Sequence, residues 1–185
     1  MVKKEFENKR VLKKLNVGCG KDIKEVNEGW INLDSHGENG ADIIFDLSKI
    51  DKGKKMPFKE NSIDYIYCSH VLEDFTDPVP IIDELIRILK KEGTLEIRVP
   101  HETTAWSNVY HKRAFNLTSL GALTGGDYGK KRPITLKSRF YGNYGLGSKI
   151  IAGILNWIPL FIFYGSPIKY FFPSTNIKFI IEKTE

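Results

Sequence analysis

The sequence predicts an α/β fold built on a mostly parallel sheet. Two observations support this. One amphipathic helix is expected at 79–93, and five short apolar runs, separated by turns or polar segments, occupy residues 12–18, 30–36, 41–47, 63–71 and 94–100. Strands that alternate with helical or irregular crossovers are typical of parallel α/β sheets.

The first three runs are read as strands joined by short connections. Residues 12–18 run into a Gly-Cys-Gly turn, and only 21–29 separate this turn from the second strand, where Ile31 and Leu33 alternate with polar residues. A turn rich in glycine and asparagine then precedes the run 41–47.

The next segment contains the clearest helix. Residues 49–62 are polar and lead into a strand at 63–71. Between 79 and 93 the apolar residues keep the spacing of a one-sided helix, and Gly93 is placed to cap its C-terminus. The strand 94–100 follows and stops at Pro100.

Polar residues follow each predicted strand, and in parallel sheets ligands bind at the carboxyl ends of the strands. These residues are Gly18, Cys19 and Gly20, then Asp34, Asp46, Ser69 with His70, and His101 with Glu102.

An adenosine derivative would suit three neighbouring strand ends. The turn from Gly18 to Gly20 offers bare backbone and N–H groups, Asp34 can accept two hydrogen bonds from vicinal ribose hydroxyls, and Asp46 can accept from an adenine amino group. Singly, each residue is also explained by a tight turn or a helix N-cap. NAD is the weaker alternative, because Ile23 stands where its fingerprint requires a third glycine.

Composition narrows the class of protein. The 185 residues suit a single domain, and the two cysteines, Cys19 and Cys68, are expected to be reduced thiols. There is no cysteine and histidine cluster for a metal, and the charged residues 1–14 do not resemble a secretory signal, so we expect a cytoplasmic protein without a metal.

Charge is unevenly distributed along the chain. Residues 1–100 carry 17 basic and 19 acidic side chains, whereas 101–185 carry 11 and 4. The second part could face an anionic partner or simply be a solvated basic surface. No aromatic RNA-binding motif accompanies the charges, so we expect no nucleic-acid partner.

Several motifs between about residues 15 and 115 resemble the class I S-adenosylmethionine-dependent methyltransferases, and more narrowly the type 11 methyltransferases. They read LNVGCG, GWINLD, ADIIFDL, MPFKENSIDYIYCSHVLEDF, ELIRILKKEGTLEIRVP and HKRAF. The resemblance implies a Rossmann-like, doubly wound, mostly parallel seven-stranded sheet whose antiparallel last strand is 176–183. It also implies S-adenosyl-L-methionine as cofactor.

The resemblance also assigns the cofactor site. The glycine turn would hold the methionine part, Asp34 the ribose, and Asp46 with Leu47 the adenine. The chain departs from the family pattern at Asn16, where many members have an acid, in its short first crossover, and at Asp74, where histidine is common. The candidate cofactor-binding residues are Asn16, Gly18, Cys19, Gly20, Asp34, Ser35, Asp46, Leu47 and Ser69.

Methyl transfer from a sulfonium needs alignment and exclusion of water, and a base only when the acceptor must lose a proton. The candidate bases are His70, His101 and His111, with Glu102 beside His101. We expect His70 to be the best placed, because the fourth strand end faces the transferable methyl group in this fold class. Cys19 and Cys68 are expected to be inert, packed thiols.

Residues 150–168 contain no charge but are interrupted by Asn156, Pro159, Gly165 and Pro167, which disfavours a membrane-spanning helix. The segment 140–172 is therefore read as core, as a subunit interface of a homodimer, or as a membrane-facing lid. The aromatic residues of the lid would be Trp157, Phe161, Phe163, Tyr164 and Tyr170, and 150–172 would make the peripheral membrane contact.

The function expected from the sequence is transfer of a methyl group from S-adenosylmethionine to a small-molecule or lipid-linked acceptor. A non-catalytic S-adenosylmethionine-binding module is the first alternative, and an NAD-dependent oxidoreductase is the second.

Overall fold

The computed structural model describes residues 12–121, 131–142 and 176–185. In these parts of the chain the elements are β1 (Lys14–Val17), η1 (Val26–Glu28), β2 (Trp30–Asp34), β3 (Ile43–Ile44), η2 (Leu47–Lys49), β4 (Ile63–Ser69), η3 (Leu72–Asp74), α1 (Val79–Ile88), β5 (Leu89–Pro100), α2 (Glu102–Ala105), β6 (Ile134–Gly142) and β7 (Asn176–Lys183). Elements labelled η are single 3-10 turns.

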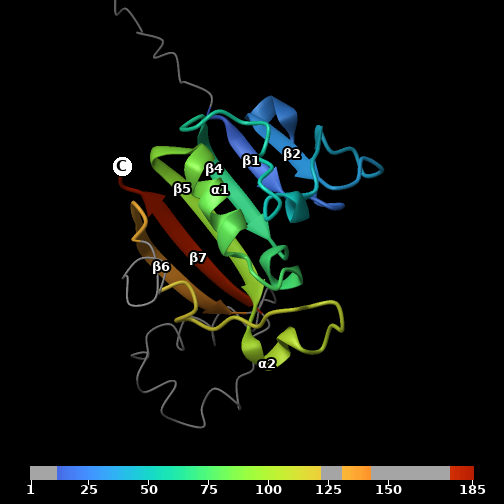
Figure 1. Cartoon of the computed structure of the whole chain (residues 1–185), viewed down its shortest axis with the longest axis vertical. Helices are drawn as coiled ribbons and strands as arrows, with labels where there is room; N and C mark the ends of the chain where they lie inside the picture. Colours follow the sequence, from blue (N-terminus) through green and yellow to red (C-terminus); the bar gives the residue numbers. More distant parts are fainter. Residues whose placement is uncertain (1–11, 122–130, 143–175) are drawn as a thin grey trace, which may run out of the picture.

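The described strands form one sheet of seven in the order β3-β2-β1-β4-β5-β7-β6 (Figure 1). Strand β7 runs antiparallel to both of its neighbours, β5 and β6, while β1 to β5 pair in parallel. The predicted Rossmann-like sheet with an antiparallel last strand is confirmed. Strand order reverses between β1 and β4, and at such a point an open α/β sheet leaves a crevice.

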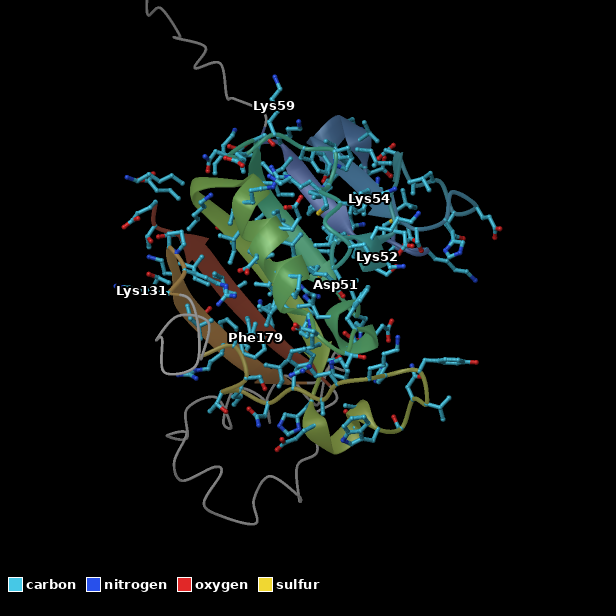
Figure 2. The ribbon with its side chains drawn as sticks, viewed as in Figure 1. Asp51, Lys52, Lys54, Lys59, Lys131 and Phe179 are labelled. Atoms are coloured by element: carbon cyan, nitrogen blue, oxygen red, sulfur yellow. The ribbon has the colours of Figure 1, made fainter. Side chains whose placement is uncertain are left out.

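One face of the sheet carries the main apolar core. Leu15, Ile66, Leu95 and Ile181 lie side by side in the register of four adjacent strands, and all four are fully buried. Helix α1 lies over this face in front of β4 and β5 (Figure 1). Phe179, fully buried on the same face, is labelled on β7 in Figure 2.

The opposite face carries stacked aromatic and cationic side chains. The ring of Trp30 meets Tyr65 and Tyr67 edge to face at centroid distances of 5.7 and 6.5 Å. Lys14 lies 5.2 Å from the centre of the Trp30 ring, and Arg98 lies 5.0 Å from that of Tyr67. These half-buried rings and cations stabilise one another through edge-to-face and cation–π contacts.

The C-terminus of α1 differs from the prediction. The helix ends at Ile88, and Gly93 is not its cap but lies inside β5. The reason is Lys183 on β7, whose Nζ donates to the carbonyls of Ile86 and Leu89 at 2.8 and 2.9 Å. A buried cation thus satisfies the helix end, so no glycine cap is needed.

The polar segment 49–62 is the connection from η2 to β4. Figure 2 labels Asp51, Lys52 and Lys54 on this connection, where all three are exposed. The first crossover is as short as predicted: residues 21–29 contain only the 3-10 turn η1.

Candidate active site

A hollow of about 230 Å³ lies at the carboxyl ends of β1, β2 and β4, beside the segment that follows β3. Six residues predicted from the sequence line it: Gly18, Asp34, Ser35, Asp46, Leu47 and His70. Five further lining residues were not assigned to the site from the sequence: Leu33, Phe45, Val71, Asp74 and Phe75.

The two glycines of the turn after β1 have left-handed backbones, with φ of 63° at Gly18 and 50° at Gly20. A Cβ atom at Gly18 would lie 2.3 Å from Cγ2 of Val71, whereas one at Gly20 would meet nothing within 4 Å. Gly18 is therefore required both by its conformation and by the close approach of Val71, and Gly20 by its conformation.

The carboxylate of Asp34 is bound to that turn. Its Oδ2 accepts from the backbone N–H of Gly20 at 2.8 Å, and its Oδ1 accepts from the N–H of His36 at 3.2 Å and the hydroxyl of Ser35 at 3.3 Å. Partial burial acts to raise the pKa of Asp34, but the hydrogen bonds from Gly20, His36 and Ser35 outweigh it and hold the pKa below its ordinary value.

Asn16 stabilises the chain after the glycine turn through hydrogen bonds and does not line the hollow. Its buried amide donates to the carbonyl of Asp22 at 2.7 Å and to Oδ1 of Asn32 at 3.1 Å. Asn32 in turn donates to the carbonyl of Lys24 at 2.9 Å. This buried amide pair ties the short first crossover to β1 and β2.

Asp46 forms the N-cap of η2 while lining the hollow. Its Oδ1 accepts from the N–H of Ser48 at 2.9 Å, and its side chain is 38% exposed. Hydrogen bonding by Ser48 lowers the pKa of Asp46. Beside it, Leu47 is buried and Phe45 is half-buried, so the hollow has an apolar wall next to the carboxylate.

His70 follows β4 with a left-handed backbone, φ 56°, which is uncommon for a residue other than glycine. Its N–H donates to the carbonyl of Arg98 at 2.9 Å, and its ring Nδ1 lies 3.1 Å from Oε1 of Glu73. The ring is 46% exposed and lines the hollow. Ser69, one residue earlier, does not line it.

The other two candidate histidines lie away from the hollow. His101 is fully buried, and its backbone pairs with Phe115. The Nδ1 of His111 donates to the carbonyl of Ala105 at 2.7 Å, and its Nε2 lies 3.0 Å from the amide of Asn108. The structure thus brings only one of the three predicted bases to the site.

Glu102 is similarly engaged elsewhere, since its carboxylate accepts from the amide of Asn116 at 3.1 Å. Cys19 and Cys68 are both free and buried, and burial raises the pKa of each thiol. Neither cysteine lines the hollow, which fits the expected role as packed thiols.

Two acidic residues after β4 were not predicted from the sequence to belong to the site. Glu73 is buried at 1% exposure behind His70, and Asp74 lines the hollow. Burial, followed by the charge of Glu73, raises the pKa of Asp74. The three-residue spacing between His70 and Glu73 was visible in the sequence, but only the turn η3 shows that it brings the two side chains together.

The segment 140–172, predicted as core, interface or lid, lies outside the described residues apart from its first three positions. Among the residues that are described, no helix has the length and hydropathy needed to cross a membrane.

Comparison with known proteins adds family evidence. A sequence model of the methyltransferase domain family (Methyltransf_11) matches residues 33–97, which run from β2 through most of β5. A search of curated proteins finds no match.

Solved structures with the same fold are distant in sequence. One belongs to the complex between the Haloferax volcanii Trm112 methyltransferase activator and a methyltransferase, with 14% identity, a TM-score of 0.62, and coverage of 95% of this chain and 84% of the other. A Galdieria sulphuraria sarcosine dimethylglycine methyltransferase is 13% identical, with a TM-score of 0.60 and coverage of 95% of this chain and 79% of the other. An Archaeoglobus fulgidus S-adenosylmethionine-dependent methyltransferase is 13% identical, with a TM-score of 0.54 and coverage of 92% of this chain and 85% of the other.

At these identities the solved structures establish the fold. The model that matches residues 33–97 describes a methyltransferase domain, so the family match and the fold both support the S-adenosylmethionine-dependent methyltransferase that the sequence resembles, with S-adenosylmethionine as its cofactor.

Proposed function

We propose that this chain binds S-adenosylmethionine in the hollow above the turn from Gly18 to Gly20 and transfers its methyl group to a small-molecule or lipid-linked acceptor. One observation carries the proposal: the Asp34 carboxylate is fixed on the glycine turn and also faces the hollow. An acid for the ribose and a bare backbone turn for the methionine part of the cofactor are thus held together.

The residues present suit the cofactor. A carboxylate has about four lone-pair positions, and Asp34 uses three within the protein, so it can still accept from a ribose hydroxyl. Phe45, Leu47 and Phe75 give the hollow apolar walls for an adenine ring. Asp46 is placed beside them to accept from the adenine amino group.

The chemistry asked of the protein is limited, because the sulfonium of the cofactor supplies an activated methyl group. The chain's own residues bind the cofactor, orient the acceptor and exclude water. His70 is the base that we assign to an acceptor that must lose a proton, since it is the histidine whose ring lines the hollow.

An exposed loop after α2 favours an amphipathic acceptor. Trp106, Val109 and Tyr110 are 64, 89 and 79% exposed, and Lys112 follows them. The loop is closed by its own hydrogen bonds, with the N–H of Tyr110 donating to Asn108 at 3.1 Å. Exposed aromatic residues beside a cation suit the boundary between lipid and water, which supports a lipid-linked acceptor and peripheral membrane contact.

Calorimetric titration tests the cofactor assignment. We expect S-adenosylhomocysteine to bind the wild-type chain and NAD not to bind. Binding of NAD alone would overturn the proposal in favour of an oxidoreductase.

A second experiment separates an enzyme from a non-catalytic binding module, the alternative favoured by the short first crossover at η1. The protein is incubated with methyl-labelled S-adenosylmethionine and with separate small-molecule and lipid extracts of cells. Label should appear in one of the two extracts. Binding of S-adenosylhomocysteine without any labelled product would favour the module.

Liposome flotation tests the membrane contact. We expect the wild type to float with liposomes that contain anionic lipids, and a Trp106→Ser, Val109→Ser, Tyr110→Ser variant to float less. Equal recovery of both proteins in the bottom fraction would remove the loop from the proposal.

A further inference from the structure

Glu73 is a buried acid, and the stability of the fold does not explain why it is buried. It is 1% exposed, its Oε1 lies 3.1 Å from Nδ1 of His70, and within the described chain its Oε2 has no hydrogen-bond partner. Burying a carboxylate costs several kcal/mol unless its oxygens are satisfied. A half-satisfied acid at this point therefore suggests a role in the neighbouring site.

The backbone of Glu73 is tied to a segment far along the chain. Its carbonyl accepts from the N–H groups of Lys112 and Arg113 at 2.7 and 3.1 Å, which ties η3 to the segment after α2. Leu72, the preceding residue, is fully buried. After burial itself, the charge of Glu73 is the second cause that raises the pKa of the buried Cys68 thiol.

The buried acid determines which ring nitrogen of His70 carries the proton. A carboxylate can only accept hydrogen bonds, so Nδ1 of His70 carries the proton and donates it. Nε2 is then left with its lone pair, and it has no hydrogen-bond partner within the described residues. The ring itself lines the hollow.

We propose that Glu73 is a positioning residue that holds His70 with Nε2 as a proton acceptor, and that the methyl acceptor is therefore a protic group such as a hydroxyl. The inference rests on the proposed function. In the step, the acceptor oxygen bonds to the methyl carbon, the electrons of the carbon–sulfur bond go to the departing sulfur, and the hydroxyl proton goes to Nε2 of His70. Solvent later takes that proton.

The tautomer of His70 is the direct test. Nitrogen-15 NMR of histidine-labelled protein distinguishes a protonated Nδ1 from a protonated Nε2 at a pH where the ring is neutral, and a His70→Asn variant assigns the signals. We expect wild-type His70 to carry its proton mainly on Nδ1. Because a free imidazole side chain favours the proton on Nε2, we expect Glu73→Ala to shift the proton there.

The chain contains an internal control. His111 donates from Nδ1 to a backbone carbonyl, so its tautomer should be the same in the wild type and in every Glu73 variant. If Glu73→Ala does not fold, Glu73→Gln serves instead, because an amide can also donate and no longer forces the proton onto Nδ1. A wild-type His70 protonated on Nε2, or a tautomer insensitive to Glu73, would overturn the inference.

The labelled product tests the acceptor class. Ethers, amines and thioethers keep a labelled methyl group in mild alkali, whereas methyl esters, formed on carboxylates that need no base, release it. We expect the label to be stable, and its release would contradict a protic acceptor. Binding of S-adenosylhomocysteine separates the two levels: if it binds but the tautomer result fails, only the role of Glu73 is lost.

Discussion

The two sides of the hollow hold their acidic residues in opposite ways. At the ends of β1 and β2, Asp34 is satisfied by two backbone N–H groups and a hydroxyl. At the end of β4, Glu73 is more deeply buried, and among the described residues its carboxylate accepts one hydrogen bond, from His70. The first arrangement stabilises the folded chain, and the second does not.

This difference predicts that the Asp34 side determines the affinity for the cofactor and that the Glu73 side affects only the methyl-transfer reaction. A carboxylate already bound to the backbone is organised before the cofactor arrives, so changes at Asp34 or the glycine turn should alter folding and cofactor affinity together. Glu73 acts through His70 and does not line the hollow, so the isosteric change Glu73→Gln should leave both folding and cofactor affinity nearly unchanged. Four substitutions and one change of pH test this contrast.

The largest effect is expected for Gly18→Ala. Its Cβ would meet Val71, and its left-handed backbone disfavours alanine, so the free energy of unfolding should fall by about 2–5 kcal/mol. Denaturant titration measures the loss. Gly20→Ala is the matched control without the steric clash and should lose about 1–2 kcal/mol.

The added change Val71→Ala identifies the cause. It should recover part of the loss in Gly18→Ala, because it removes the atom that the new Cβ meets. Equal losses for Gly18→Ala and Gly20→Ala would contradict a role for the close approach of Val71.

Asp34→Ala should weaken binding of S-adenosylhomocysteine by about 1.5–3 kcal/mol, or about 10- to 150-fold, because charge-assisted hydrogen bonds are lost. Calorimetric titration of the two proteins gives the ratio. An unchanged affinity would remove Asp34 from the cofactor site.

A smaller effect is expected from pH. The pKa of Asp34 is lower in the folded chain than its ordinary value, so the ionised carboxylate stabilises the fold. This stabilisation is complete above the ordinary value of about 3.9 and is lost as the pH falls through the lower folded value. Relative to Asp34→Asn, the wild type should therefore lose its advantage in acid, and denaturation at about pH 6, 4 and 3 measures it. A constant difference would contradict the assignment.

Asp46→Ala should have a modest effect. Losing the N-cap of η2 should cost about 0.5–1 kcal/mol of stability, and losing one exposed hydrogen bond to the adenine should weaken binding by about fivefold or less. Thermal unfolding and calorimetry check the two values. A loss of affinity larger than that of Asp34→Ala would mean that the two aspartates have been ranked wrongly.

The smallest effect is expected for Glu73→Gln. It replaces a half-satisfied buried charge by an amide of the same shape, so stability should change by no more than about 1 kcal/mol. The affinity for S-adenosylhomocysteine should not change. A loss of affinity comparable to that of Asp34→Ala would contradict the separation of the two sides.

The sequence predicted the Asp34 side of the hollow well. Parallel strands place their carboxyl ends at one edge, so Gly18 and Asp34, although sixteen residues apart, had to meet once β1 and β2 paired. The seven-stranded sheet was also predicted, because the family that the motifs between about residues 15 and 115 resemble has that sheet.

The β4 side of the hollow was less predictable. Three histidines follow strands or lie in the next loop, but whether each ring faces the hollow depends on backbone angles such as the left-handed turn at His70. The spacing of Glu73 from His70 was visible, but the burial of Glu73 was not, because it depends on η3 and on the backbone contacts with Lys112 and Arg113. Gly93 was misread as a cap because the cation that replaces it, Lys183, is 90 residues further along the chain.

The central claim is that the glycine turn and Asp34 together hold the cofactor, the turn its methionine part and Asp34 its ribose. A crystal structure of the chain with S-adenosylhomocysteine tests it most directly. We expect the ligand to lie over Gly18–Gly20 with a ribose hydroxyl donating to Asp34 and its sulfur on the side of His70. A ligand bound elsewhere, or a ribose turned away from Asp34, would contradict the account.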